Sequence, residues 1–525
     1  MTQSSLHGED APPRTRHGAR RHRTERRPAR RGLRILRWSA LTLAVLILGT
    51  AGAGYLYYQH LNDNIKKKKL NIGDYAAPEA TPNADGQTPL NILMIGSDSR
   101  NTAEDLKLGG SKGDVGRAPL ADVQMLVHVS ADRSNMSVVS LPRDTMIPIP
   151  RCTDPDTGKK YEALSLSMAN ESLGRGGPGC TVSTWEQLTK IHIDHFMMVD
   201  FSGVVDMADA IGGVPVCVKQ NVWSHTSDGH GSGLKLKAGT TPVKGKQALQ
   251  WLRTRYGFED GGDIGRTHAQ HMYMTSMVRQ LRKDAKLTNP GEMRKLAEAA
   301  TNALTVDEGL GTVKKLYDLS GQLKQVPPSR ITMTTLPTVQ WSQNTARLVP
   351  APGDADDLIS MVRDDTPLDG RGAKHKDDQK TEPTSKDPAA PAGELAVQVR
   401  NGTGADGQAP AFQRASAVQQ VLVQKGFTRA LVDTTPATEP RTTILYPSAD
   451  LKGDAQALAK ALGVPLGQVR KSTDVSGVTL VVGADWRTGT AYHAPEKPTQ
   501  APSTASVLHG DKTDACMSVQ PGFTW

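Results

Sequence analysis

The sequence predicts an α/β protein with a central sheet, because short apolar runs of strand length alternate with segments of helical periodicity. Three apolar runs indicate buried strands, at 90–96, 123–129 and 136–141. Three other segments carry apolar residues at helical spacing, at 182–189, 201–211 and 268–286. Strands that alternate with helices favour a layered architecture in which helices flank a sheet.

The length of 525 residues predicts two folded domains with linkers, because it exceeds what one hydrophobic core usually organises. The hydrophobic fraction of 37% is low, and 50 Gly and 33 Pro indicate many loops and tails. We expect seven parts in order: an Arg-rich tail at 1–37, a transmembrane helix at 38–58, a polar stalk at 59–88, a first α/β domain at 89–362, a disordered linker at 363–393, a small α/β domain at 394–487 and a largely disordered tail at 488–525.

The net charge of +9 is concentrated at the N-terminus, where residues 1–37 hold eleven Arg against three acidic residues. The next 21 residues, 38–58, carry no charge and are long enough to cross the hydrocarbon core as a helix. Trp38 begins this span and tyrosines end it, which fits the preference of aromatic rings for the headgroup regions. We therefore expect a helix embedded in membrane lipid.

The basic tail predicts the direction of this helix. The positive-inside rule places the Arg-rich end in the cytoplasm and the rest outside, since the opposite flank has only the weaker lysine run at 66–69. A cleavable signal peptide is the alternative, because the stretch 51–53 resembles a cleavage site, but the aromatic end and apolar length favour an uncleaved anchor. The tail lacks a folded reader, so we expect no nucleic-acid partner, the alternative being a membrane-tethered transcription regulator.

Four cysteines in an exported region are compatible with two disulfides, for which three pairings exist. We favour Cys152 with Cys180, because this bond would fasten the loop between them to the core. Cys217 and Cys516 are left open. Buried free thiols are the alternative, and the sequence offers no CxxC pattern for a zinc site.

Two aspartates stand at strand ends of the predicted sheet. Asp98, in the motif GSDSR at 96–100, follows the first apolar run, and Asp122 directly precedes the second. Two carboxylates at a sheet edge could hold Mg²⁺ through oxygen and leave positions open for phosphate. Capping and turn hydrogen bonds are the alternative role, because they explain most loop aspartates.

Arginines form the second candidate group. Arg143 follows Pro142 at the end of the third predicted strand, where binding to Asp144 or another carboxylate is its alternative role.

Arg253 and Arg255 are two positions apart and would share a face of an extended segment, while Arg266 and Gln270, four apart, would share a helix face. Planar guanidinium groups suit bidentate contacts with a pyrophosphate. A salt-bridge network with the aspartates at 260 and 263 is the alternative.

These motifs, taken in order, resemble those of the LytR-CpsA-Psr family over residues 89–285. They are NILMIGSDSR at 91–100, ADVQMLVHVS at 121–130, SLPRDT at 140–145, NESLGRGG at 170–177, the segment at 181–216 and GKQALQWLRTRYGFEDGGDIGR at 245–266. VRNGTG at 399–404, KGF at 425–427 and TTILYP at 442–447 resemble the LytR C-terminal domain often appended to that family. Six ordered motifs are far more specific than any one alone.

The resemblance implies a central mixed sheet flanked by helices, and an extracytoplasmic phosphotransferase. Such an enzyme moves a glycopolymer, such as teichoic acid, from a polyprenyl-pyrophosphate carrier to peptidoglycan, with pyrophosphate hydrolysis as an open side activity. The implied cofactor is Mg²⁺, with Mn²⁺ as an alternative. The implied catalytic residues are Asp122, Asp98 and Arg143, with both aspartates as metal ligands, and the implied pyrophosphate-binding residues are Arg100, Arg143, Arg253, Arg255, Arg266 and Gln270.

The sequence departs from the family pattern at two positions where an Arg is usual, Leu120 and Ala269. Arg117 is a candidate to compensate for the first, and the second predicts one positive charge fewer around the pyrophosphate. These departures leave a non-catalytic protein that binds lipid-linked polymer or peptidoglycan as the alternative function.

The expected reaction is attack by an acceptor hydroxyl on the sugar-linked phosphorus, with polyprenyl monophosphate leaving. Asp122 is preferred over Asp98 as the proton acceptor. The methionine-bearing stretches 196–201 and 204–211 are candidates for an apolar lipid tunnel, with simple core packing as the alternative.

Overall fold

The computed structural model of the chain describes residues 30–80, 82–83, 85–98, 117–229, 231–259, 261–284, 290–371, 388–404, 409–493, 498–505, 507–510 and 516–525. The chain divides into two compact units, Met1–His60 and Leu61–Trp525.

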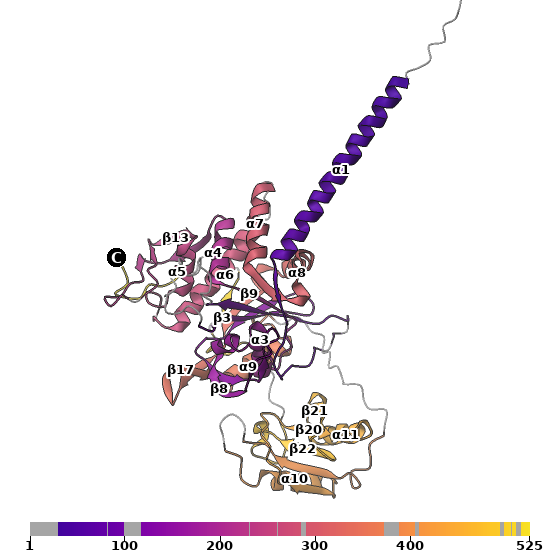
Figure 1. Cartoon of the computed structure of the whole chain (residues 1–525). Coiled ribbons are helices and arrows are strands. Elements are labelled where there is room, and N and C mark those ends of the chain that lie inside the picture. The colour runs from indigo at the N-terminus through magenta and orange to yellow at the C-terminus, as the bar shows by residue number, and fades with distance from the viewer. Residues whose placement is uncertain are drawn as a thin grey trace, which may run out of the picture. The chain divides into compact units, whose positions relative to one another are not determined.

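Helix α1, Arg30–Asn64, is the long helix of Figure 1 and accounts for the described part of the first unit. Among the described residues, its stretch Leu36–Asn64 is the one helix long and apolar enough to cross a membrane. Large apolar side chains such as Leu46 and Leu48 are exposed along it. The helix extends beyond the predicted span 38–58 at both ends, because helical hydrogen bonding continues into the polar flanks.

A mixed sheet forms the centre of the first α/β domain. Its eight strands within the described residues follow the order β1-β14-β9-β2-β3-β4-β15-β23. In that order their bounds are Lys66–Lys68, Leu304–Asp307, His195–Val199, Leu90–Ser97, Ala121–Val129, Met136–Ser140, Ile331–Thr335 and Leu508–His509. β2, β3 and β4 are antiparallel neighbours. β9 runs parallel to β2 and antiparallel to β14, and β15 runs parallel to β4 and antiparallel to β23. The three predicted strands are therefore confirmed as the middle of the sheet.

Helices cover both faces of this sheet (Figure 1). On one face Leu93, Leu126 and Val139 pack with Trp185 of α3 and with α9. On the other face alternate residues of the same strands, including Met125 and Val127, pack with α8. Within the described residues, the helices of this domain are α3 (Pro178–Thr189), α4 (Phe201–Ala210), α5 (Lys246–Arg253), α6 (Asp263–Asp284), α7 (Pro290–Ala303), α8 (Val313–Gln325) and α9 (Asp354–Arg363).

Short ribbons of paired strands decorate the same domain. They are β5 (Met146–Ile149) with β8 (Leu164–Met168), β6 (Cys152–Thr153) with β7 (Lys160–Tyr161), β10 (Val214–Val218) with β13 (Gly239–Val243), β11 (Val222–Trp223) with β12 (Lys235–Leu236), and β16 (Thr338–Trp341) with β17 (Asn344–Pro350). Short 3-10 helices lie at Ala169–Gly174, Glu308–Leu310 and Pro328–Arg330.

The predicted stalk at 59–88 is wrong for most of its described length, because the chain packs into the domain from about Leu61. Leu61, Ile65 and Ala77 are buried, and β1 is an edge strand paired with β14. The lysines of β1 are exposed on this edge strand, a common way to keep sheet edges soluble. The first domain therefore begins well before residue 89.

The second α/β domain has the predicted order of elements. Its five strands in the described residues follow the order β19-β18-β22-β20-β21. The elements are β18 (Val397–Asn401), α10 (Arg414–Gln424), β19 (Ala430–Asp433), β20 (Thr443–Tyr446), α11 (Lys452–Leu462), β21 (Val469–Lys471) and β22 (Val478–Val482), with 3-10 turns at Ala449–Leu451, Leu466–Gln468 and Ala484–Trp486. Val399, Val418, Leu458 and Leu480 are among the fully buried residues of its own core.

The predicted linker and tail are partly corrected by the structure. Of the linker 363–393, residues 372–387 lie outside the described residues, while Leu368 is buried in the first core. The tail 488–525 is not largely disordered over its described part, since β23 joins the central sheet and Cys516 is bonded to Cys217. Local composition predicted disorder, but pairing with distant residues orders this segment.

Two disulfides use all four cysteines. Cys152 is bonded to Cys180, the favoured pairing, with their Cα atoms 5.8 Å apart. Cys217 and Cys516, which the sequence left open, are bonded across a separation of 299 residues.

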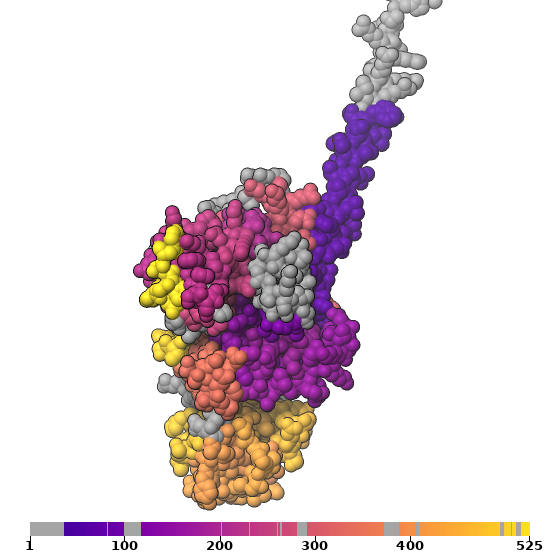
Figure 2. All heavy atoms as spheres, turned by 60° about the vertical axis from the view of Figure 1, so that its left-hand side comes forward, coloured from indigo at the N-terminus to yellow at the C-terminus, as the bar shows by residue number. Residues whose placement is uncertain are grey.

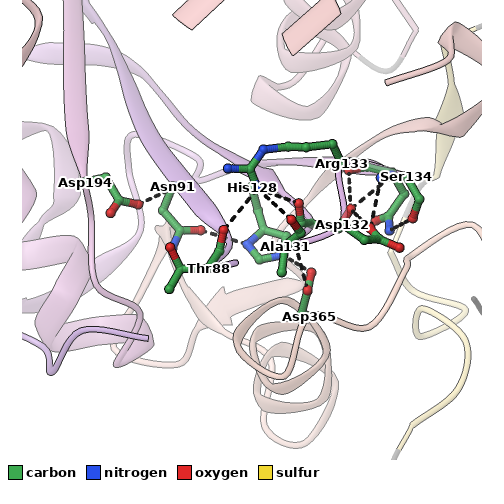
Figure 3. A network of polar contacts seen from close by, with 11 residues as sticks. Thr88, Asn91, His128, Ala131, Asp132, Arg133, Ser134, Asp194 and Asp365 are labelled. Atoms are coloured by element: carbon green, nitrogen blue, oxygen red, sulfur yellow. Dashed lines mark hydrogen bonds and ion pairs between the residues drawn. The ribbon is translucent and has the colours of Figure 1, made fainter. Parts of the chain in front are cut away.

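A polar network fastens the end of the sheet at which β2 begins (Figure 3). The two ring nitrogens of buried His128 lie 2.7 Å from Oδ1 of Asn91 and 2.9 Å from Oδ1 of Asp365. The backbone amide of Ala131 donates to the same Asp365 carboxylate, and that of Asn91 donates to Asp194. This network joins β2 and β3 to the turn after α9, at the end of the sheet opposite Asp98 and Asp122.

Candidate functional site

Asp98, Asp122 and Arg143 lie at one end of the central sheet. In the register of β2 and β3, Ser97 pairs with Ala121, so the two aspartates follow and begin adjacent strands. β3 pairs Met125 with Ser140, the last residue of β4, three positions before Arg143. The predicted placement of these three residues at one sheet edge is therefore what the structure shows.

Asp98 is 4% exposed, and two donors from the described part of the chain contact its carboxylate. Its Oδ1 accepts from the backbone amide of Leu120 at 2.7 Å, and its Oδ2 is paired with the guanidinium of Arg117. Leu120 thus contributes its backbone here, and Arg117 supplies a positive charge beside Asp98. Arg100 lies outside the described residues.

Asp122 and Arg143 belong to a chain of alternating charges. Nη1 of Arg143 donates to Oδ1 of Asp122 at 3.0 Å, and its Nε lies 3.5 Å from Oδ2 of Asp144. Arg347, from β17, lies 3.3 Å from Oδ1 of the same Asp144. Arg347 could not be predicted from local pattern, because it joins the site from a strand more than 200 positions away in the chain.

α5 and α6 bring the remaining predicted residues together. Nε1 of Trp251 donates to the carbonyl of Ala269 at 2.9 Å, and Nε2 of Gln270 donates to the carbonyl of Leu252 at 3.2 Å. These bonds hold the end of α5, where Arg253 lies, against the first turns of α6, which carry Arg266. Arg266 and Gln270 are each 6% exposed.

The expectation of an extended segment from Arg253 to Arg255 is only half right. Arg253 is the last residue of α5, and extended backbone begins at Thr254. Arg266 and Gln270 share α6 as predicted. Of the alternative ion-pair partners, Asp260 and the side chain of Asp263 lie outside what the structure describes.

His271 was missed by the sequence reasoning and connects the two halves of the site. Its Nε2 lies 2.5 Å from Oγ of Ser140, at the end of β4, and the residue is 1% exposed. Burial lowers the pKa of His271 to about 3, and the nearby His268 adds to this effect. The imidazole is therefore neutral, so Nε2 accepts a hydrogen bond from Ser140 and ties α6 to the sheet end that carries Arg143.

Ala269, the second departure from the family pattern, is fully buried. It belongs to a core cluster with Trp251 and Phe258, and its carbonyl accepts the indole bond of Trp251. At this position the chain uses a small side chain for packing between α5 and α6.

The two aspartates fit Mg²⁺ in donor type, because this ion takes oxygen ligands and commonly uses only one or two carboxylates, with phosphate and water completing its shell. Asp98 and Asp122 are here neutralised by Arg117 and Arg143. Among the described residues, no group of three or more His, Cys, Asp or Glu side chains gathers as a metal site. Any ion would therefore depend on substrate oxygens for the rest of its ligands.

A cavity of about 340 Å³ lies beside α6, and it contains none of the predicted site residues. It is lined by α6, the β10–β13 ribbon and the C-terminal tail, with Thr240, His268, Arg279 and His509 among its polar residues. The methionines proposed for a lipid tunnel lie elsewhere: Met197 and Met198 are partly buried and pack against the cores on opposite faces of the sheet. Their packing fits the alternative role.

The fold and the site define a class: a two-domain α/β protein whose first domain gathers acidic and guanidinium groups at one end of a mixed sheet. The model of the LytR_cpsA_psr family matches residues 54–360, more than half of the chain. A second model, LytR cell envelope-related transcriptional attenuator, matches residues 394–486. The chain belongs to the LytR-CpsA-Psr family and carries a LytR C-terminal domain.

Curated relatives are similar over part of their length. The cell wall biosynthesis protein LcpA of Corynebacterium glutamicum is 30% identical over 327 residues, which cover 56% of this chain and 58% of LcpA. The polyisoprenyl-teichoic acid–peptidoglycan teichoic acid transferase TagU of Bacillus subtilis is 26% identical over 277 residues, covering 53% of this chain and 79% of TagU. This chain thus spans little more than half the length of LcpA.

Solved structures of the same family were also compared with the chain. The LytR-Csp2A-Psr enzyme from Actinomyces oris is 20% identical, with a TM-score of 0.41, over 57% of this chain and 96% of that chain.

Proposed function

We propose that this protein is a membrane-anchored, extracytoplasmic phosphotransferase that moves a glycopolymer from a polyprenyl-pyrophosphate carrier to peptidoglycan. The observation that carries the proposal is the joining of two groups of residues. Asp98, Asp122 and Arg143 lie at one sheet end, and the His271–Ser140 bond ties to it the helix that bears Arg266 and Gln270. The names of the relatives LcpA and TagU support a role in cell wall polymer attachment.

The charges of the site suit a reaction at a pyrophosphate. The acceptor hydroxyl forms a new bond to the sugar-linked phosphorus, the bond from that phosphorus to the bridging oxygen breaks, and polyprenyl monophosphate leaves. The hydroxyl proton passes to a carboxylate, for which we propose Asp122. Arg143, Arg253, Arg255 and Arg266 bind the phosphate oxygens and stabilise the negative charge that grows on the leaving group.

Asp98 and Asp122 are the residues that would hold Mg²⁺. When bound, Mg²⁺ neutralises charge on the pyrophosphate oxygens and helps to orient the reacting groups. Because Arg117 occupies the Asp98 carboxylate in this structure, it would have to yield to the ion.

The long apolar helix α1 supports the location that we propose. A carrier with a polyprenyl tail stays in the membrane, so a domain fixed beside the same leaflet meets it at high effective concentration. The eleven arginines of residues 1–37 favour a cytoplasmic N-terminus by the positive-inside rule.

The experiment that tests this function uses the full chain in detergent with Mg²⁺, peptidoglycan and a polyprenyl-pyrophosphate-linked glycan labelled in its sugar. Release of polyprenyl monophosphate together with label in the peptidoglycan is the expected result. A matched pair of variants tests whether the proposed site performs the transfer. Arg255→Ala should lose transfer activity, whereas Arg470→Ala should keep it, because Arg470 is exposed on the second domain.

The competing function is a binding protein without catalysis, and the buried Ala269 favours it in one respect, since it leaves the site one guanidinium poorer than is usual for the family. Such a protein would bind the labelled glycolipid but release no polyprenyl monophosphate. Full polymer attachment in cells that carry the Arg255→Ala chain would also point to it.

A further inference from the structure

The C-terminal tail lies outside both matched family models, which end at residues 360 and 486. Its described residues nevertheless pack on the first domain. β23 pairs with β15 as the last strand of the central sheet, and Gly510 donates its amide to the carbonyl of Ile331 at 2.9 Å. The chain therefore leaves the first domain after α9, forms the second domain and returns to the first.

The tail is then fixed to strand β10. Cys516 is bonded to Cys217, the amide of Met517 donates to the carbonyl of Cys217 at 2.9 Å, and the amide of Lys219 donates to the carbonyl of Met517 at 2.9 Å. Figure 2 shows the end of the chain, in yellow, lying over the magenta part of the surface that contains this region. A covalent bond and strand-like hydrogen bonds thus set the position of the next residues.

Those next residues run along the loop that joins α5 to α6. The amide of Glu259 donates to the carbonyl of Ser518 at 3.0 Å, and the amide of Gln520 donates to the carbonyl of Gly257 at 3.0 Å. Phe258 and Val519 form a β-bridge between these bonds. The loop begins beside Arg255 and ends at the helix that carries Arg266.

This loop has little regular structure of its own. Gly257, Glu259 and Gly261 all have positive φ angles, of 113°, 48° and 76°, and a left-handed backbone is unfavourable for a residue such as Glu. The side-chain Oε1 of Gln520 reaches the amide of Gly257 at 3.4 Å. The tail therefore supplies hydrogen bonds to a loop whose backbone is left-handed at Glu259.

The apolar side of the tail completes the core beneath the same loop. Met517 and Val519 belong to the cluster that contains Phe258, Trp251 and Ala269, and Phe258 is fully buried. Trp251 and Ala269 are the residues whose hydrogen bond joins α5 to α6. Tail, loop and both helices thus share one packed unit.

We propose that residues 516–520 are a positioning element of the pyrophosphate site: they hold the loop between Arg255 and Arg266 so that these guanidinium groups face one substrate together. The proposal rests on the proposed function. It assigns a role to a segment that both family models leave out, and it makes the returning tail a part of the catalytic domain.

The test compares variants of the full chain in detergent. Gln520→Ala removes the side-chain bond to the loop, and Cys217→Ser with Cys516→Ser removes the covalent tie without leaving an unpaired thiol. Trp525→Ala is the matched control, because Trp525 lies on the same tail but contacts Lys235 and the carbonyl of Leu236 in β12. The amide exchange of residues 254–262, the binding of geranylgeranyl pyrophosphate and the kcat and KM of transfer are measured for each.

The tail variants should exchange the amides of residues 257–259 at least tenfold faster, with β3 unchanged, which separates local loosening from general unfolding. They should bind geranylgeranyl pyrophosphate more weakly and lose about tenfold to a hundredfold in kcat, as expected from small misplacement of substrate-binding groups. Trp525→Ala should stay within about twofold of the parent.

The proposal is overturned if the loop amides exchange at the parent rate in the tail variants, or if the loop loosens while pyrophosphate binding and kcat stay unchanged. A parent chain without transfer activity would contradict the proposed function alone. The exchange and geranylgeranyl pyrophosphate measurements would then still decide the role of the tail.

Discussion

Nη1 of Arg143 lies 3.0 Å from Oδ1 of Asp122, and the same guanidinium faces Asp144 through its Nε. One planar group thus contacts two carboxylates. Asp122, the proposed base, is therefore held beside Arg143, which we propose to bind the phosphate oxygens. A lysine at this position has one compact ammonium and cannot keep both contacts with the same geometry.

We predict that Arg143→Lys lowers the kcat of transfer nearly as much as Arg143→Ala, by about a hundredfold, because the geometry of the contact and not only its charge is required. The measurement is the release of polyprenyl monophosphate under saturating glycolipid, with Arg470→Ala as the control. A lysine variant that works at the parent rate would show that a positive charge alone suffices.

Arg117 and Mg²⁺ are expected to compete for Asp98. Arg117→Ala should lower the Mg²⁺ concentration that gives half of the thermal stabilisation by the ion, because Asp98 then lacks its counter-ion in the metal-free chain. We expect this concentration to fall by about threefold to tenfold. Such a change corresponds to about 1 kcal/mol, the energy of the Arg117–Asp98 ion pair that the ion no longer has to displace. Thermal unfolding with increasing Mg²⁺ measures it without reference to activity.

Asp98→Asn is the control for this titration. It keeps the size of the side chain but weakens the metal ligand, so the stabilisation by Mg²⁺ should largely disappear. If Arg117→Ala leaves the midpoint of the titration unchanged, Arg117 does not compete with the ion.

The buried His271 predicts acid sensitivity of the first domain. Burial lowers the pKa of His271 from 6.5 to about 3. At a pH between these two values, the imidazole is protonated in the unfolded chain but neutral in the native state. Stability from this group is complete above pH 6.5 and is lost as the pH falls toward 3. The free energy of unfolding should therefore drop by about 1.4 kcal/mol per pH unit from this residue alone.

The glutamine of His271→Gln does not titrate. Between pH 6 and pH 4, the free energy of unfolding of this variant should therefore fall less steeply with decreasing pH than that of the parent, by about 1.4 kcal/mol per pH unit. Urea unfolding followed by tryptophan fluorescence at several pH values gives the comparison, and His225→Gln, at an exposed histidine, is the control that should keep the parent slope. Parallel curves for His271→Gln and the parent would mean that the imidazole is already protonated in the native state.

The sequence predicted those parts of the molecule whose structure is set by residues close together in the chain. The apolar runs of β2, β3 and β4 are adjacent strands, so Asp98, Asp122 and Arg143 could be placed at one sheet end from their distance to those strands. The pair Arg266 and Gln270 followed from helical spacing in the same way. In each case the geometry is set by residues close in the chain.

Contacts between distant and unremarkable residues could not be foreseen in this way. Ser140 and His271 are 131 positions apart, and neither has a local pattern that marks it as a partner of the other. β1 is a run of lysines that becomes a strand only because β14 lies beside it, and the tail is ordered by β15, Cys217 and the loop near Gly257. Tertiary pairing overrides composition at all of these places.

The two departures from the family pattern should respond in opposite ways when an arginine is introduced. Ala269 is fully buried beside Trp251, so Ala269→Arg forces a long charged side chain into a packed core and should cost about 3 kcal/mol or more of stability. Leu120 is half-buried and holds Asp98 through its backbone, so Leu120→Arg should change stability by less than about 1 kcal/mol. Urea midpoints and transfer rates of both variants make the test. An Ala269→Arg chain as stable as the parent would mean that space for a guanidinium exists between α5 and α6, contrary to the packing seen here.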